Sequence, residues 1–205
     1  MRDNKAADAL AGARDVFFRC GYEGASVDEI AAKGRVSKAT LYAHFPSKEE
    51  LFLRVIEAEC ARLASEVVRP LEDGSDLQSQ LQQLARRMLD LVMDDEYIRL
   101  LRTCIGATEA LPEAGRQYMQ AGPTQARTFI ERIFEGAKKR GRLRIDDTQL
   151  ASERFIHLCI SGVLMPRLLA VERTVDREKY VKHAVADFLK LYESKNGETP
   201  IKTEG

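Results

Sequence analysis

The sequence predicts an all-α fold, in which an N-terminal three-helix domain is joined to a larger helical domain. Apolar residues recur at helical spacing through nearly all of the 205 residues, and no stretch sustains the alternation typical of a strand. Glycine, proline and capping serine residues mark the breaks between the predicted helices. We expect the first domain to span residues 1–47, the second to span 48–194, and residues 195–205 to form a polar, disordered tail.

The first three predicted helices are closely spaced. The first covers residues 5–19 and stops at Gly21, a residue type that readily adopts the left-handed conformation. Its apolar stripe comprises Leu10, Ala13, Val16 and Phe17. Ser26 and Glu29 form a capping box that begins a second helix, which runs to Lys33. Ser37 caps a third helix over residues 38–44, which ends because Pro46 disfavours a helical conformation at Phe45.

A long helix over residues 47–68 is expected to connect the two domains, since Ser47 and Glu50 repeat the capping box at its start. Further helices are predicted at residues 76–93, 96–110, 112–120, 123–140, 148–171 and 177–194. Ser75 and Asp95 are the predicted caps of the first two of these helices. Pro166 is expected to kink the helix that contains it.

Residues 26–45, SVDEIAAKGRVSKATLYAHF, form a pattern of two short helices joined by a tight turn. In a helix-turn-helix, the first helix braces against the DNA backbone while the second enters the major groove. The apolar residues that would lock such a unit together are Ile30, Ala31, Val36, Leu41 and Phe45. Those left available to solvent or DNA are Lys38, Ala39, Thr40, Tyr42 and His44. The segment therefore predicts a DNA-binding domain.

The charge pattern agrees with this prediction. The chain has 32 basic and 32 acidic residues, so nucleic-acid binding requires a local basic patch rather than overall attraction. Between Lys33 and Lys48 the sequence contains four cations and no Asp or Glu. This acid-free window, which also contains Arg35 and Lys38, overlaps most of the predicted helix-turn-helix.

The N-terminus and the cysteine pattern exclude several other classes. MRDNKAADAL lacks the apolar run of a secretory signal, and the apolar stretch at residues 158–165 is too short to span a membrane, so we expect a cytoplasmic protein. The cysteines, which we expect to be buried free thiols, are Cys20, Cys60, Cys104 and Cys159. Their isolated positions lack the spacing of a zinc or redox motif, and no metal or cofactor is expected.

Residues 25–52, ASVDEIAAKGRVSKATLYAHFPSKEELF, resemble the tetracycline-repressor (TetR) family of bacterial regulators. The resemblance extends back over GARDVFFRCGYEG. The later stretches LPEAGRQYMQAGPTQAR and RGRLRIDDTQLASERF resemble the ligand domain of the AefR-like subgroup. The resemblance implies a homodimeric repressor that binds a palindromic operator and is released by a small, largely apolar effector.

Carried over position by position, the resemblance implies phosphate contacts from Ser26, Ser37, Thr40, Tyr42, His44 and Lys48. It places Lys38, Ala39 and also Thr40 against base edges, and lysine can donate to the O6 and N7 acceptors of guanine. Arg35 and Ala39 stand where the family commonly has glycine. Arg35 therefore either occupies a mildly strained turn or adds a phosphate contact, and it joins the predicted DNA-binding residues.

An effector pocket is predicted in the C-terminal domain, where many apolar walls and a few polar groups would hold the ligand. Its candidate lining residues are Met88, Arg102, Thr103, Tyr118, Arg127 and His157. For each residue taken alone, the competing interpretation is an ordinary core or surface position. The last two helices carry wide apolar stripes, and the family resemblance implies that they form a four-helix bundle with a second copy. The candidate interface residues are Phe155, Cys159, Gly162, Val163, Val185 and Phe188.

Two other functions are weighed against a repressor. One is a helical enzyme, although HExxH, GxSxG, P-loop and GxGxxG patterns are all absent from the sequence. The other is a ligand-binding adaptor that has lost operator recognition. Against this second alternative, the sequence retains Lys38, Thr40, Tyr42 and Lys48.

Overall fold

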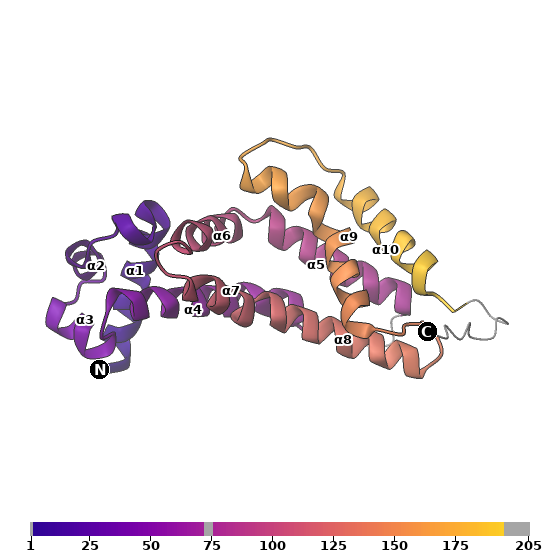
Figure 1. Ribbon diagram of the computed structural model, residues 1–205, viewed down its shortest axis with the longest axis horizontal. Coiled ribbons are helices and arrows are strands. Elements are labelled where there is room, and N and C mark those ends of the chain that lie inside the picture. The colour runs from indigo at the N-terminus through magenta and orange to yellow at the C-terminus, as the bar shows by residue number, and fades with distance from the viewer. Residues whose placement is uncertain (1, 72–75, 195–205) are drawn as a thin grey trace. The chain divides into compact units, whose positions relative to one another are not determined.

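The structure, a computed structural model, describes residues 2–71 and 76–194 and shows ten α-helices over these residues (Figure 1). The helices are α1 (Arg2–Gly24), α2 (Val27–Lys33), α3 (Lys38–His44), α4 (Lys48–Val68), α5 (Leu77–Met93), α6 (Asp95–Ala107), α7 (Glu113–Ala121), α8 (Pro123–Lys139), α9 (Thr148–Leu168) and α10 (Arg177–Tyr192). The only other pairing in the described part is an isolated antiparallel bridge between Leu143 and Glu193. The predicted all-α class is therefore confirmed.

Most helix boundaries follow the predicted signals. Gly21 has φ 72° and interrupts the helical geometry of α1 at the predicted position. The cap of α6 was predicted wrongly, because the Asp94 carboxylate accepts from the backbone N–H groups of Glu96 and Tyr97, which makes Asp95 the first helical residue. Helix α9 contains Pro166 and ends at Leu168, before the predicted end at residue 171. The predicted cap Ser75 and the tail at residues 195–205 lie outside the described residues.

The chain divides into two compact units. The first comprises Met1–Arg69 and Leu91–Ala126, and the second comprises Pro70–Asp90 and Arg127–Gly205. The packing thus groups α4, α6 and α7 with the N-terminal helices, a division that differs from the one expected at residue 47. Helices α5 and α8 each run from one unit into the other.

The core of the first unit forms around α1, which packs against α2, α3, α4 and α6. The Phe17 ring meets the Phe52 ring edge-on, with 4.9 Å between the ring centres. Ile30, Leu41 and Phe45 are also buried, as the helix-turn-helix pattern predicts. In the second unit α9 packs against α10, and the rings of Phe134, Phe155 and Phe188 form its aromatic core. No helix of the described residues has both the length and the apolar character needed to cross a membrane.

Candidate nucleic-acid interface

Serine caps set the starts of the three helices around the predicted DNA-binding segment. The hydroxyl of Ser26 accepts from the N–H of Glu29 at 3.1 Å, that of Ser37 from Thr40 at 3.0 Å, and that of Ser47 from Glu50 at 3.1 Å. All three predicted caps are confirmed, and each satisfies a backbone donor that the helix itself leaves unpaired. The reciprocal half of the first capping box is absent, because the Glu29 carboxylate pairs with Arg19 on α1 instead.

Helix α3 is anchored by one side and presents the other to solvent. Leu41 and the following Phe45 are buried in the first unit. Lys38, Ala39 and Tyr42 are exposed, and Tyr42 keeps 46% of its surface accessible. The half-buried Thr40 has its hydroxyl oxygen 2.8 Å from that of Ser37, so these two polar groups are held together at the start of the helix. His44, also half-buried, lies at the other end of α3.

The turn between α2 and α3 is tight and contains a strained residue. Arg35 has φ 51°, in the left-handed region that side chains other than glycine rarely adopt. This confirms the expected strained turn, and the exposed Arg35 side chain also adds a cation beside α3. Gly34 caps the end of α2 and lies directly against Gly12 of α1. If Gly12 carried a Cβ, that atom would lie only 2.7 Å from the Gly34 Cα.

Lys48, at the start of α4, is held by groups from the end of α1. Its ammonium donates to the Glu23 carbonyl at 3.2 Å and lies 4.8 Å from the centre of the Tyr22 ring. The Tyr22 hydroxyl donates to the Glu49 carboxylate at 3.0 Å. Burial, followed by the neighbouring Glu49, raises the pKa of the Tyr22 phenol to about 12, so it remains a donor at neutral pH. Tyr22 was not predicted from the sequence, where its only local signal is an aromatic residue directly after Gly21.

The basic window at residues 33–48 contains no acidic residue, but in the fold two of its lysines contact carboxylates from outside the window. The Lys38 ammonium lies 2.5 Å from the carboxylate of Asp28 on α2. The Lys33 ammonium lies 3.6 Å from the carboxylate of Asp15 on α1. Hydrogen bonding to Asp28 raises the pKa of Lys38, which is fully charged at neutral pH. The charge available to DNA is therefore smaller than the sequence window indicates, and residues outside the window determine it.

An alternating network of charges joins α1 to α4 and α6. Arg14 on α1 contacts Glu59 at 3.0 Å and Glu96 at 2.7 Å. Arg62 on α4 contacts the same two carboxylates at 3.0 Å and 2.8 Å. Sequence spacing predicts the Glu59–Arg62 pair within one helix, whereas the contacts between helices depend on the fold. The network ties the helix-turn-helix module to α6 within the first unit.

Three of the predicted effector residues lie in the first unit. Tyr118 is buried, with its hydroxyl oxygen 2.7 Å from that of Tyr97, and burial raises the pKa of both phenols. The buried Thr103 hydroxyl donates to the Arg99 carbonyl at 2.8 Å within its own helix. Arg102 is exposed. The Tyr97–Tyr118 pair is a polar group within an apolar interior. Thr103 instead fits the competing interpretation of an ordinary core position, because its hydroxyl is satisfied within its own helix.

The other three predicted effector residues lie in the second unit. Met88 is buried, and His157 is exposed. The Arg127 guanidinium lies 3.5 Å from the Glu131 carboxylate and 3.6 Å from that of Glu153. Each residue thus has an ordinary structural environment, and the effector site stays a prediction.

The residues predicted for a dimer interface mostly belong to the interior of the second unit. Five of them are buried within the chain, namely Phe155, Cys159, Val163, Val185 and Phe188. They contact their own unit because α9 and α10 turn these stripes toward each other and toward α8, so their side chains are not on the surface that a partner would meet. Gly162 is half-buried and faces Tyr180 and Arg173. An interface on these helices would use other, exposed residues.

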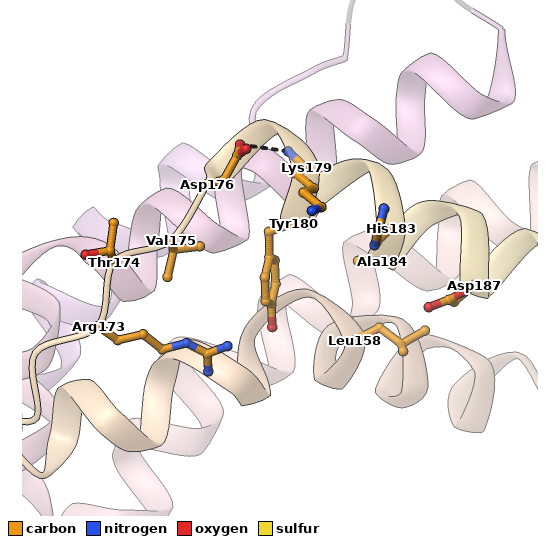
Figure 2. A pocket seen from close by; sticks show the side chains of 10 residues that line it. All are labelled: Leu158, Arg173, Thr174, Val175, Asp176, Lys179, Tyr180, His183, Ala184 and Asp187. Carbon is orange, nitrogen blue, oxygen red and sulfur yellow. Dashed lines mark hydrogen bonds between the residues drawn. The ribbon is translucent and has the colours of Figure 1, made fainter.

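A pocket of about 380 Å³ lies on the second unit between α9, the segment that follows it and α10 (Figure 2). The Tyr180 ring points toward α9, where a Cβ on Gly162 would come within 3.0 Å of its hydroxyl. The Arg173 guanidinium donates to the Gly162 carbonyl. The pocket was not predicted from the sequence, because its walls come from three separate segments.

The cysteines are free thiols in the structure. Cys60, Cys104 and Cys159 are buried as predicted, whereas Cys20 is half-buried. Burial raises the pKa of both Cys60 and Cys104 to about 12, so these thiols are protonated and unreactive at neutral pH. The described residues contain no group of three or more His, Cys, Asp and Glu side chains arranged to hold a metal ion.

Comparison with protein-family models matches both parts of the chain. Residues 9–55 match the bacterial regulatory proteins of the tetR family, and residues 79–194 match the C-terminal domain of AefR-like transcriptional repressors. The latter match alone covers more than half of the chain.

Individual relatives agree with these matches. The HTH-type transcriptional repressor AcnR of Corynebacterium diphtheriae is 38% identical over 142 residues, which are 68% of each chain. The HTH-type transcriptional activator FasR of Mycolicibacterium smegmatis is 36% identical over 46% of this chain, a match that spans only 43% of FasR. The solved structure of the flavonoid-responsive regulator FrrA superposes with a TM-score of 0.81 at 28% identity, over 92% of this chain and 97% of FrrA.

Proposed function

Because the chain belongs to the TetR family of bacterial regulatory proteins and carries an AefR-like C-terminal domain, we propose that it represses transcription by binding a palindromic operator as a homodimer. It is a transcriptional regulator with a helix-turn-helix DNA-binding domain. The observation that carries the proposal is the exposed face of α3, with Lys38, Ala39 and Tyr42 on a helix whose other side is anchored in the core.

The proposed contacts divide into two groups by chemistry. Lys38 and Ala39, with Thr40, would meet base edges, because they lie in the first turn of α3. Hydroxyl, imidazole and cationic groups around them would bind phosphate oxygens: Ser26, Arg35, Ser37, Tyr42, His44 and Lys48. The hold of Tyr22 and Glu23 on Lys48 supports its role, since a preordered ammonium loses less conformational entropy on binding phosphate.

Binding to the DNA upstream of the chain's own gene tests this proposal. Tyr42→Ala and Lys48→Ala should weaken binding in fluorescence anisotropy while leaving the circular dichroism spectrum unchanged. Lys48→Ala should also reduce the salt dependence of binding by about one released counterion. Lys179→Ala, which removes an exposed cation from the second unit, is the matched control. Wild-type affinity in the Tyr42 and Lys48 double variant would contradict the assignment.

We propose that dimers form through exposed parts of α9 and α10, which extend beyond the buried stripes. Met165 on α9 and Leu191 on α10 keep 58% and 65% of their surfaces accessible, so both apolar side chains are available to a partner. A two-fold dimer would present two copies of α3 and so match a palindromic site.

We also propose that a small, largely apolar effector binds in the AefR-like domain and lowers operator affinity. The name of FrrA says that this relative responds to flavonoids, which supports an organic effector for the present chain. If effector and operator favour different states, each must lower the affinity for the other by the same factor. Calorimetric titration of flavonoids and other apolar compounds, with and without operator, measures this coupling. A ligand that bound equally well in both titrations would exclude release by that compound.

A further inference from the structure

Asp28 and Lys38 place opposite charges at the adjacent starts of α2 and α3. Asp28 is the second residue of α2, and Lys38 is the first residue of α3. The Lys38 ammonium lies 2.5 Å from the Asp28 carboxylate, and the two side chains keep 55% and 74% of their surfaces accessible. The pair is therefore on the surface, where an ion pair contributes little to folding. Because the pair lies on the proposed DNA-reading face, it can affect DNA binding instead.

From this contact we infer that Asp28 lowers the affinity of the chain for DNA by competing for the Lys38 ammonium. The inference rests on the proposed function, in which α3 enters the major groove. An ammonium that donates to a guanine or a phosphate must leave the carboxylate or share its donors with it. DNA binding therefore costs the free energy of the ion pair, which lowers the affinity for the operator. A lower affinity makes the regulator easier to release from DNA.

The other cations near α3 differ from Lys38 in their contacts. Arg35, in the preceding turn, has no ion-pair partner among the described residues, and Lys48 is held by a carbonyl and an aromatic ring instead of a carboxylate. Lys33 has a carboxylate partner, but its pair with Asp15 is longer, at 3.6 Å. Among the proposed DNA-binding cations, Lys38 alone shows a close contact with an acid in the described structure.

Asp28 also has a structural role, which the experiment must separate from the proposed one. A carboxylate in the first turn of α2 interacts favourably with the helix dipole. Its loss would lower stability slightly, but it would not increase DNA affinity. Asp28→Asn removes the charge with little change in shape, whereas Asp28→Glu keeps the charge. Thermal unfolding of each variant measures the structural contribution separately.

The test is a double-mutant cycle of operator affinity, with Asp28→Asn, Lys38→Gln and the double variant measured by fluorescence anisotropy. The probe is a duplex selected from a random pool by the wild-type protein. Asp28→Asn should tighten binding about two- to fivefold per subunit, the factor that corresponds to an exposed ion pair. The gain should vanish in the Lys38→Gln background, and Asp28→Glu should bind like wild type.

Glu50→Gln is the matched control, because Glu50 is an exposed acid in the first turn of α4. It removes the same charge without touching Lys38, and it should change affinity less than Asp28→Asn does. Unchanged or weaker binding by Asp28→Asn would overturn the inference, as would a gain that persists without Lys38. The proposed function would fail separately if the wild-type protein selected no duplex over a scrambled one.

Discussion

At the scale of single residues, Gly12 and Gly34 allow α1 and the α2–α3 turn to approach more closely than any side chain would permit. A Cβ on Gly12 would lie 2.4 Å from the Gly34 nitrogen, and one on Gly34 would lie 2.8 Å from the Asp8 carbonyl oxygen. Both obstacles are backbone atoms, so a shift of a flexible side chain cannot remove them. The position of the turn that precedes α3 thus depends on two residues that carry no chemistry.

Gly12→Ala should therefore lower the free energy of unfolding by about 1–3 kcal/mol, the usual range for overpacking. Gly106→Ala is the control, because Gly106 is also helical but no side chain and no other helix of the described residues comes within 4 Å of its Cβ position. That change should raise stability by about 0.5–1 kcal/mol. Urea denaturation monitored by circular dichroism measures both values. Equal stability of the Gly12 variant and wild type would show that α1 and the turn adjust freely.

The sequence predicts single residues well where the signal is local. The serine caps and the strained Arg35 follow from neighbours within a few positions along the chain. Tyr22, Asp28 and Gly12 were missed because each acts on a residue of another helix, and periodicity does not specify how two helices cross. For the same reason, the sequence identifies the apolar stripes that contain Phe155 and Phe188, but it does not show that both rings are buried within their own chain.

At the scale of elements, α3 is only seven residues long and depends on its cap. Ser37→Ala should lower stability by about 1 kcal/mol, because it leaves the Thr40 N–H without its acceptor. It should also weaken operator binding by loosening the first turn of α3. Ser37→Asp restores a capping acceptor but adds a negative charge beside DNA, so stability should recover while affinity falls further. Thermal unfolding measures the stability and fluorescence anisotropy measures the operator affinity. Recovery of both stability and affinity in Ser37→Asp would contradict the expected effect of the added charge.

The charge network between α1, α4 and α6 predicts a pH dependence. The hydrogen bond from Arg14 is the main cause that lowers the pKa of Glu96. A carboxylate whose folded-state pKa is depressed stabilises the fold above its unfolded value of about 4.3, and this contribution is lost as pH falls through the folded pKa. Wild type should therefore lose more stability than Glu96→Gln between pH 6 and pH 3. The effect should be modest, since the Glu96 side chain is 44% exposed.

Denaturation at several pH values measures this difference, with Glu57→Gln as the control for a charge outside the network. Within the described part of the chain, Glu57 pairs only with Arg54 on its own helix. Identical pH profiles of wild type and Glu96→Gln would show that the network contributes nothing to the attachment of α6.

Most helices of the fold were predicted to within a few residues, but this network was not, because it requires the packing of three helices.

At the scale of the whole molecule, the proposed dimer depends on exposed apolar residues of the second unit. Met165→Glu should shift purified protein toward monomer in light scattering, because it places a charge within the proposed interface. Ile105→Glu is the matched control, since Ile105 in the first unit is similarly exposed, at 54%. The proposal would be contradicted if only the control variant lost the dimer. It would also be contradicted if the wild-type protein were monomeric both at micromolar concentration and when bound to operator DNA.

Cross-linking from the exposed face of α3 shows whether that face meets DNA. A photoreactive p-azidophenylalanine in place of Tyr42 keeps the size of the ring and reports what lies beside it. The same residue in place of Met119, exposed on α7 of the first unit, is the control. We predict that position 42 cross-links to the selected operator and position 119 does not. Operator bound tightly without any cross-link from position 42 would contradict the account.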